Sequence, residues 1–220
     1  MKMTAQHLAA GLVSVALLGA GLACDRGNLP SAPSGSKAAS TSAGFDRTSA
    51  SDQKFRWDII SVNFATGTVS AGGMASSRAN DGSKITLTGS GTFGPNGEND
   101  VTGGGTWVTF DPAGVSTGSG TYQVTGLVRF ELAPGTFPLT TDLIGNKADA
   151  RAGLAFLRIR YNDGSRGVLA VSCDIAGTPH TVFEGVTVSK GFVDFWNREA
   201  PAPGVDANRT AFHVLSEEED

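Results

Sequence analysis

Three residues in the last third of the chain have side chains that can carry out nucleophilic or acid–base chemistry. Cys173 lies on the apolar face of an alternating run, residues 169–175. If the chain reverses around residues 176–179, His180 and Glu184 on the returning strand face the same side of the sheet as Cys173. A thiol, an imidazole and a carboxylate in one pocket could form an activated nucleophile. The imidazole and carboxylate alone could form a general acid–base pair.

Each of these residues also has a structural explanation. The predicted register sets Val171 opposite Glu184, and a bulge at Gly185 would change it. A free cysteine is usually a small buried hydrophobic residue, and a histidine directly after a proline is typical of a turn or an edge. Glu184 faces solvent if its neighbour Phe183 faces inward. We therefore expect a structural Cys173, with catalysis by the trio as the alternative.

A second group of candidates is aromatic. Small barrels of about eight strands can hold one small ligand among such side chains, or the rings can simply fill the core. The four residues are Trp57, Phe93, Trp107 and Tyr122. The two distant cysteines and three histidines show no metal-ligand spacing, so we expect no metal. We also expect no cofactor, because the Gly-Ser-Gly phrases open onto strands, whereas phosphate loops lead into helices.

A glycine-rich phrase recurs at residues 89–93, 103–107 and 118–122, each time as three small residues followed by threonine and an aromatic residue. In the first and third copies, apolar and glycine positions alternate with threonine and serine, which is the period of a β-strand. Glycines on the aromatic face let a strand coil, as closed or strongly curved sheets require. The three copies therefore predict curved strands.

The whole pattern predicts an all-β domain over residues 54–215, an antiparallel up-and-down meander of 8–10 strands. A closed β-barrel is favoured over a β-sandwich. Residues 133–153 are expected to be irregular, with a helical turn near 146–151, and to lie over the barrel mouth where a ligand would enter. The predicted strands are Phe55–Phe64, Thr68–Arg78, Lys84–Phe93, Val101–Phe110, Ser116–Leu132 (bent or broken at Gly126), Leu154–Tyr161, Gly167–Ile175, His180–Val188, Phe192–Trp196 and Ala211–Leu215.

Two turns share the pattern Arg-x-Asn-Asp-Gly-Ser followed by a basic residue, at residues 78–84 and 160–166. In a meander both lie at the same end. The favoured explanation is a good hairpin turn used twice. An ancient duplication and a paired cationic rim are the alternatives.

Residues 1–23 predict a bacterial export signal, because Lys2 precedes a short apolar run. The segment Gly21-Leu22-Ala23-Cys24 resembles the lipobox of bacterial lipoproteins, which implies lipidation of Cys24 and membrane attachment. Ordinary cleavage, with a possible disulfide between Cys24 and Cys173, is the alternative. Residues 24–53 are rich in Ser, Ala, Gly and Pro and predict a flexible tether. Either route predicts an extracytoplasmic location.

The glycine-rich strands resemble the small barrels of the allene oxide cyclase and dirigent families, and Gly105-Thr106-Trp107 resembles the Gly-x-Trp of lipocalins. The net charge is −4, and the acidic tail at residues 216–220 carries all of it, so the charge predicts no nucleic-acid partner. We expect a binding or surface module for a small hydrophobic or amphipathic ligand. A cyclase-like, isomerase-like or hydrolytic barrel enzyme and a structural cell-envelope protein are the alternatives.

Overall fold

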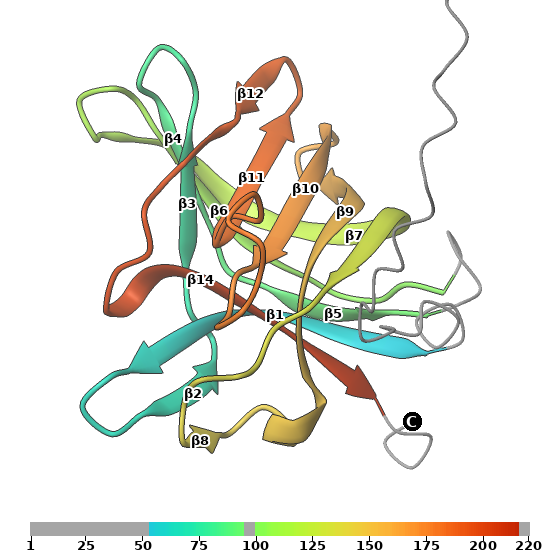
Figure 1. Ribbon diagram of the computed structural model, residues 1–220. Helices are drawn as coiled ribbons and strands as arrows, with labels where there is room; N and C mark the ends of the chain where they lie inside the picture. Colours follow the sequence, from blue (N-terminus) through green and yellow to red (C-terminus); the bar gives the residue numbers. More distant parts are fainter. Residues whose placement is uncertain (1–52, 95–99, 216–220) are drawn as a thin grey trace, which may run out of the picture. The chain divides into compact units, whose positions relative to one another are not determined.

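The computed structural model describes residues 53–94 and 100–215, which form an all-β domain (Figure 1). The predictions for the leader, for Cys24, for the tether up to residue 52 and for the acidic tail lie outside the described residues. Across residues 53–94 and 100–215, no helix has the length and apolar character needed to cross a membrane.

Six strands close into an antiparallel barrel, and each is hydrogen-bonded to the next. The last strand pairs with the first and, at residues 150–151, with the fifth, so the ring has no open edge. This confirms the predicted all-β, antiparallel barrel. In ring order the strands are β1 (Lys54–Asn63), β5 (Ser90–Phe93), β6 (Gly104–Phe110), β7 (Ser116–Ala133), β9 (Ala150–Tyr161) and β14 (Gly204–Leu215).

The other strands extend this ring. One run continues from β9 and a second run continues from β6, while β8 pairs in parallel with β2 beside β1. A 3-10 turn, η2 (Lys147–Asp149), confirms the helical turn expected near residues 146–151. These strands are β2 (Thr68–Ala71), β3 (Ala75–Arg78), β4 (Lys84–Leu87), β8 (Thr141–Asp142), β10 (Arg166–Cys173), β11 (Gly185–Lys190), β12 (Val193–Phe195) and β13 (Asn197–Arg198).

Two predicted strands are each divided in two. The predicted strand Thr68–Arg78 is interrupted at Gly72 and Gly73. Gly72 has φ +84°, and a Cβ on Gly73 would lie 2.0 Å from the Ile60 carbonyl oxygen. The predicted strand Lys84–Phe93 is interrupted at residues 88–89. There β5 stays in the ring beside β1, while β4 leaves it to pair with the far half of β6. Glycine therefore divides these two segments.

The strand order departs from a simple meander because β14 lies between β9 and β1. It is twelve residues long, whereas only residues 211–215 were expected to form a strand. Asn208 makes the longer strand possible. It adopts φ +52°, its Oδ1 accepts a hydrogen bond from the Ser76 N–H at 2.6 Å, and its amide donates to the Ala200 carbonyl at 3.0 Å.

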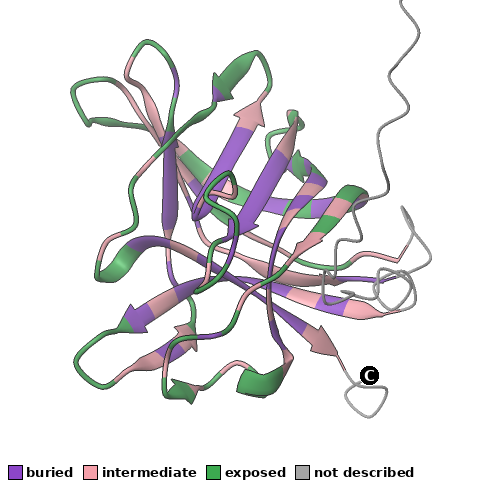
Figure 2. Ribbon diagram, viewed as in Figure 1, coloured by how far each residue is buried: buried purple, intermediate pink, exposed green. Residues whose placement is uncertain are grey.

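Aromatic rings fill the interior of the six-stranded ring. Phe130 lies 4.8 Å from both Phe55 and Phe93 and 5.1 Å from Phe212, measured between ring centroids. Trp57, on the same strand as Phe55, is completely buried. Figure 2 shows the buried residues along the strands and the exposed ones mainly at the turns.

A smaller apolar cluster lies beneath the segment expected to form a lid. Phe137, from that segment, packs with Ile60, Val62 and other residues of β1, β2 and β14. Asp142 fastens the segment further, since its Oδ2 lies 2.7 Å from Nε2 of His213, and both side chains are buried. The segment is therefore packed against the barrel.

Candidate functional site

The structure places the three residues considered for catalysis in two different environments. Cys173 ends β10 as a buried, free thiol, and Glu184, directly before β11, is also buried. His180 lies in the connection between these strands and is exposed. The expected inward orientation of His180 was therefore wrong, whereas Cys173 and Glu184 do face the interior.

The predicted strand over residues 180–188 was also wrong, because β11 begins only at Gly185. Pairing with β10 places Val171 opposite Val186, whereas the sequence-based register set it opposite Glu184. Glu184 consequently lies in the last position of the connection rather than within a strand pair.

Two successive turns explain the longer connection. The Thr178 N–H donates to the Ile175 carbonyl at 3.0 Å, and the Thr178 hydroxyl accepts from the Ile175 N–H at 3.1 Å. The Val182 N–H then donates to the Pro179 carbonyl at 2.9 Å. A hydroxyl that accepts from a nearby backbone N–H offers the chain an alternative to the sheet ladder.

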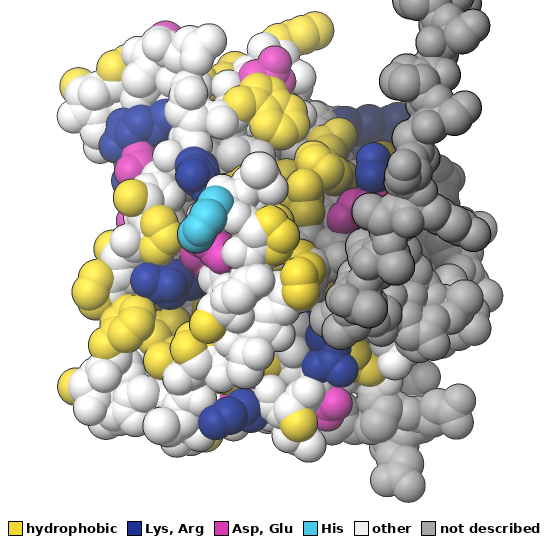
Figure 3. Space-filling view, in the orientation of Figure 1, with side chains coloured by type: hydrophobic (Ala, Val, Ile, Leu, Met, Phe, Trp, Pro, Cys, Tyr) yellow, Lys and Arg dark blue, Asp and Glu magenta, His cyan; other side chains and the backbone are white. Residues whose placement is uncertain are grey.

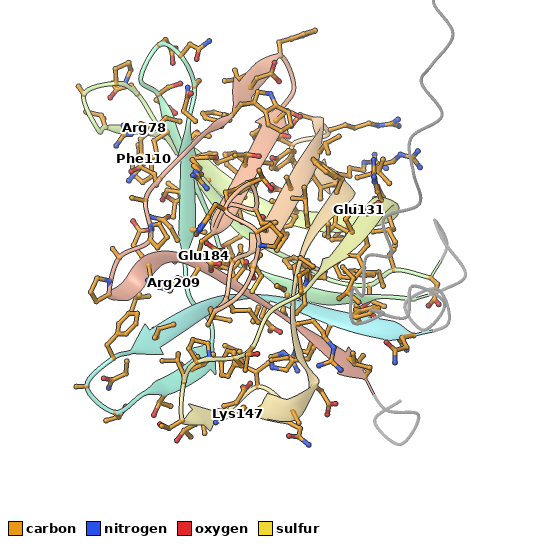
Figure 4. The ribbon with its side chains drawn as sticks, in the orientation of Figure 1. Arg78, Phe110, Glu131, Lys147, Glu184 and Arg209 are labelled. Carbon is orange, nitrogen blue, oxygen red and sulfur yellow. The ribbon has the colours of Figure 1, made fainter. Side chains whose placement is uncertain are left out.

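The Glu184 carboxylate joins two segments of backbone. Its Oε2 accepts a hydrogen bond from the Asp174 N–H at 2.5 Å, and its Oε1 accepts from the Thr210 N–H at 2.7 Å. Burial raises the pKa of Glu184 to about 8, although these two hydrogen bonds and the nearby Arg209 act to lower it. Figure 4 shows Glu184 and Arg209 close together beside β14. The carboxyl therefore keeps its proton to a higher pH than an exposed glutamate does.

The neighbourhood of Glu184 disfavours an activated thiol. Burial, and secondarily the charge of Glu184, raise the pKa of Cys173 well above its ordinary value, so the thiolate is suppressed. Described residues line three hollows at the surface of the domain. Neither Cys173 nor Glu184 lines any of these three. Catalysis by this trio stays a prediction.

All four aromatic residues proposed to line a cavity are buried, and they pack against neighbouring side chains of the core. Trp57 and Phe93 belong to the ring interior. Trp107 packs edge-on against Tyr161, with ring centroids 5.8 Å apart. The hydroxyl of Tyr122 donates to the Thr88 carbonyl at 2.9 Å. These contacts favour the filled-core alternative for Trp57 and Phe93, while Trp107 and Tyr122 also border hollows at the surface.

The largest of the three hollows, about 500 Å³, lies at the segment expected to receive a ligand. We call it the loop hollow, and residues 135–137, 146–148, 150 and 151 line it. Phe137 and Ala150 supply apolar surface, and Lys147 and Arg151 supply two positive charges. No acidic side chain lines it, since Asp149 is not among the lining residues.

Lys147 is exposed on η2 and is labelled in Figure 4. Arg151 is held in place, because its Nη1 donates to the carbonyls of Ala148 and Ala150 at 2.8 and 2.9 Å. The hollow therefore combines an apolar wall with one hydrogen-bonded cation, Arg151, and one exposed cation, Lys147. This arrangement can bind the charged end and the apolar end of one small molecule.

The other two hollows have volumes of about 340 and 280 Å³. The first lies between β6–β7 and β11–β12, and we call it the mouth hollow. The second lies over β7 and the β9–β10 turn. Figure 3 shows one face of the molecule, where apolar side chains occur in small groups separated by both acidic and basic residues.

Within the part of the chain that the structure describes, no group of three or more His, Cys, Asp or Glu side chains could hold a metal ion. Comparison of the chain with protein-family models, with curated proteins and with solved structures finds no match.

Sequence reasoning missed the residues that tertiary contacts bring together. Asp142 and His213 form a buried pair although they are far apart in the sequence, and no local pattern marks either of them. Lys190 also went unnoticed, although its ammonium lies 4.3 Å from the centroid of the Trp107 ring. Its position between the predicted strands over residues 180–188 and 192–196 was the only local signal.

Proposed function

We propose that the protein is an exported β-barrel module, anchored through a lipid on Cys24, which binds a small amphipathic anion in the loop hollow. The single observation that carries the ligand proposal is the composition of that hollow. Phe137 and Ala150 form an apolar wall beside Lys147 and Arg151, with no lining acid to neutralise them. A ligand with one anionic group and a short apolar body matches both features.

The size of the hollow supports this proposal. Its volume of about 500 Å³ falls within the range of about 300–1,000 Å³ that is common for small-molecule sites. The hollow also has a firm support, because Phe137 packs into the cluster with Ile60 and Val62, and the Thr136 N–H donates to the Ala176 carbonyl at 2.8 Å. A supported site loses less conformational entropy when a ligand binds.

The test is calorimetric titration with dodecanoate, kept below its micellar concentration, and with dodecyltrimethylammonium as a probe of opposite charge. We expect dodecanoate to bind at one site and the cation to bind at least ten-fold more weakly. In the variant Lys147→Glu, dodecanoate should bind about ten-fold more weakly, because an attractive charge becomes a repulsive one.

Arg166→Glu is the matched control. Arg166 is exposed at the start of β10 and does not line the loop hollow, yet this variant changes the net charge by the same amount. Its affinity for dodecanoate should equal that of the unchanged protein. Equal weakening by both variants would show a general charge effect, and equal affinity for both amphiphiles would overturn the proposed anion selectivity.

The anchor is tested separately by the intact mass of the protein extracted from membranes of the expressing bacterium. We expect the mass of a chain that begins at Cys24 and carries a diacyl- or triacylglyceryl group. The variant Cys24→Ala should be recovered without the lipid and outside the membrane fraction. An unlipidated mass for the unchanged protein would refute the anchor without affecting the ligand proposal.

A further inference from the structure

The mouth hollow is formed by a sheet that curves until its two ends face each other. The strands from β12 through β11, β10, β9, β7 and β6 to β4 are hydrogen-bonded in that order. Residues from β6 and β7 line one side of the hollow, and residues from β11 and β12 line the other. Parts of the chain that are distant in sequence therefore converge at this hollow.

Apolar surface from rings forms the floor and one wall. Trp107, Phe110 and Phe195 line the hollow, together with the exposed side chain of Val193. The indole N–H of Trp107 already donates to the Asn162 Oδ1 at 3.1 Å. Trp107 therefore presents carbon atoms to the hollow. Phe110 (labelled in Figure 4) adds a half-buried ring, with the Lys84 ammonium 4.9 Å from its centroid.

The hydroxyls of Thr109 and Thr117, which also line the hollow, can each accept a further hydrogen bond. The Thr117 hydroxyl donates to the Thr109 hydroxyl at 2.9 Å, which in turn donates to the Gly118 carbonyl at 3.4 Å. A hydroxyl oxygen has two lone pairs, so each of these threonines can still accept a hydrogen bond from a bound molecule.

Beside the Trp107 ring, Asp163 and Lys190 form an ion pair that also borders the hollow. The ammonium lies 4.3 Å from the Trp107 ring centroid and 4.9 Å from that of Tyr161, and it also donates to the Ser165 hydroxyl at 3.1 Å. The hydrogen bond from Lys190 lowers the pKa of Asp163 to about 2, so the carboxylate stays charged. The pair supplies acceptors and donors but no net charge.

From these contacts we propose that the mouth hollow binds one unit of a neutral saccharide. A sugar ring presents C–H groups on its faces, which match the rings and Val193. Its hydroxyls match the two threonine oxygens and the Asp163 carboxylate. A purely apolar ligand would leave these polar groups without partners, which is costly. An ionic ligand would meet a pair that is already neutralised.

This proposal is independent of the loop hollow, because the two hollows share no lining residue. It also gives the repeated Asn-Asp-Gly turn a use. Ser83 of the first turn and Asp163 of the second both border the mouth hollow, whereas the sequence analysis expected a ligand at the other end of the barrel, near residues 133–153.

The test is titration of the ¹⁵N-labelled mature protein with maltotriose, cellobiose and chitotriose, each at millimolar concentrations, monitored by amide chemical shifts. We expect at least one of them to produce saturable shifts confined to residues 107–110, 117–118 and 190–195. Phe110→Ala should weaken binding about ten-fold, and Thr117→Val about five-fold, through the lost stacking and hydrogen bond.

Thr92→Val is the matched control. Thr92 forms a similar exposed hydroxyl pair with Thr102 at 2.8 Å but does not line the mouth hollow. This variant should bind the saccharide unchanged, and thermal unfolding establishes that all three variants are folded. The proposal is overturned if none of the three saccharides gives saturable shifts, if the shifts map elsewhere, or if the control weakens binding as much as Thr117→Val.

Discussion

The interior of the six-stranded ring and the polar crossing between β10, β11 and β14 are equally buried but are held together differently. In the ring interior, Phe93, Phe130 and Phe212 pack ring against ring. At the polar crossing, which we define as Cys173, Glu184 and Thr210 with their partners, a carboxyl group joins backbone segments. The stability of the ring interior depends on how well the side chains fill its volume. The stability of the polar crossing depends on directed hydrogen bonds and on the protonation of Glu184.

This difference bears on where chemistry can occur. A filled apolar interior has no group that can transfer a proton. The polar crossing contains a carboxyl whose pKa is raised to about 8 by burial, so it changes charge near neutral pH. Its hydrogen bonds to two backbone N–H groups nonetheless explain Glu184 as a structural residue. Four predictions test this contrast.

The largest effect is expected in the ring interior. Trp57→Ala should lower the free energy of unfolding by about 3–5 kcal/mol, because it leaves a cavity among packed rings. Trp57→Phe should cost much less, since the buried indole N–H has no hydrogen-bond partner among the described residues. Urea unfolding measures both. Equal costs for the two variants would show that the indole N–H matters more than the volume of the ring.

The second effect is a pH dependence at the polar crossing. The folded-state pKa of Glu184 is raised from 4.5 to about 8. The stabilisation that this raised pKa contributes to the folded state is fully present below about pH 4.5. It is lost as the pH rises through about 8. The unfolding free energy should fall across this window by up to about 1.4 kcal/mol per pH unit.

Glu184→Gln removes this titration and should flatten the dependence between pH 5 and 8. It should be less stable than the unchanged protein at pH 5, where its amide cannot satisfy both N–H donors, and closer to it at pH 8. Urea unfolding at several pH values checks this result. An unchanged pH profile in the variant would assign the dependence to another group.

The third effect is a single buried hydrogen bond at the polar crossing. Thr210→Val removes the hydroxyl that donates to the Ser172 carbonyl at 2.6 Å, at a site where both residues are buried. The unfolding free energy should fall by about 1–3 kcal/mol, because a buried acceptor loses its donor. Thr210→Ser keeps the hydroxyl and should restore most of that loss. A serine variant as unstable as valine would mean that packing of the methyl group decides the stability.

The smallest effect is the comparable hydrogen bond beside the ring interior. Tyr122→Phe deletes the hydroxyl that donates to the Thr88 carbonyl at 2.9 Å while keeping the ring. We expect a cost of about 1 kcal/mol, which is the usual net value of one hydrogen bond. Thermal unfolding is sufficient to measure it. A cost as large as that of Trp57→Ala would contradict the view that this region depends mainly on volume.

Much of the fold was predictable from the sequence. The alternation in residues 55–64 and 154–161 correctly predicted β1 and most of β9. The Asn-Asp-Gly turns were also predictable, because each is held by hydrogen bonds within the turn. The Asp81 side chain accepts from the Ser83 N–H, and the Asp163 side chain accepts from the Ser165 N–H. These features depend on neighbours in the chain.

The candidate sites were less predictable. The sequence placed a ligand near residues 133–153, where the loop hollow lies, but it did not identify Lys147 and Arg151 as its cations. It paired Glu184 with the wrong strand position, because the hydroxyl of Thr178 forms a turn that alternation does not reveal. It identified Trp107 but not Lys190, whose contact with that ring needs two distant strands to meet.

The sequence by itself determined most of the β-strands and the two repeated turns, because these follow from side-chain period and local hydrogen bonds. Only the tertiary structure decided that β14 closes the ring, that Glu184 is buried and that the mouth hollow exists. Each of these depends on contacts between segments far apart in the chain, such as Thr210 with Glu184. Such contacts leave no periodic signal, since they are selected by packing and by the need to satisfy buried polar groups.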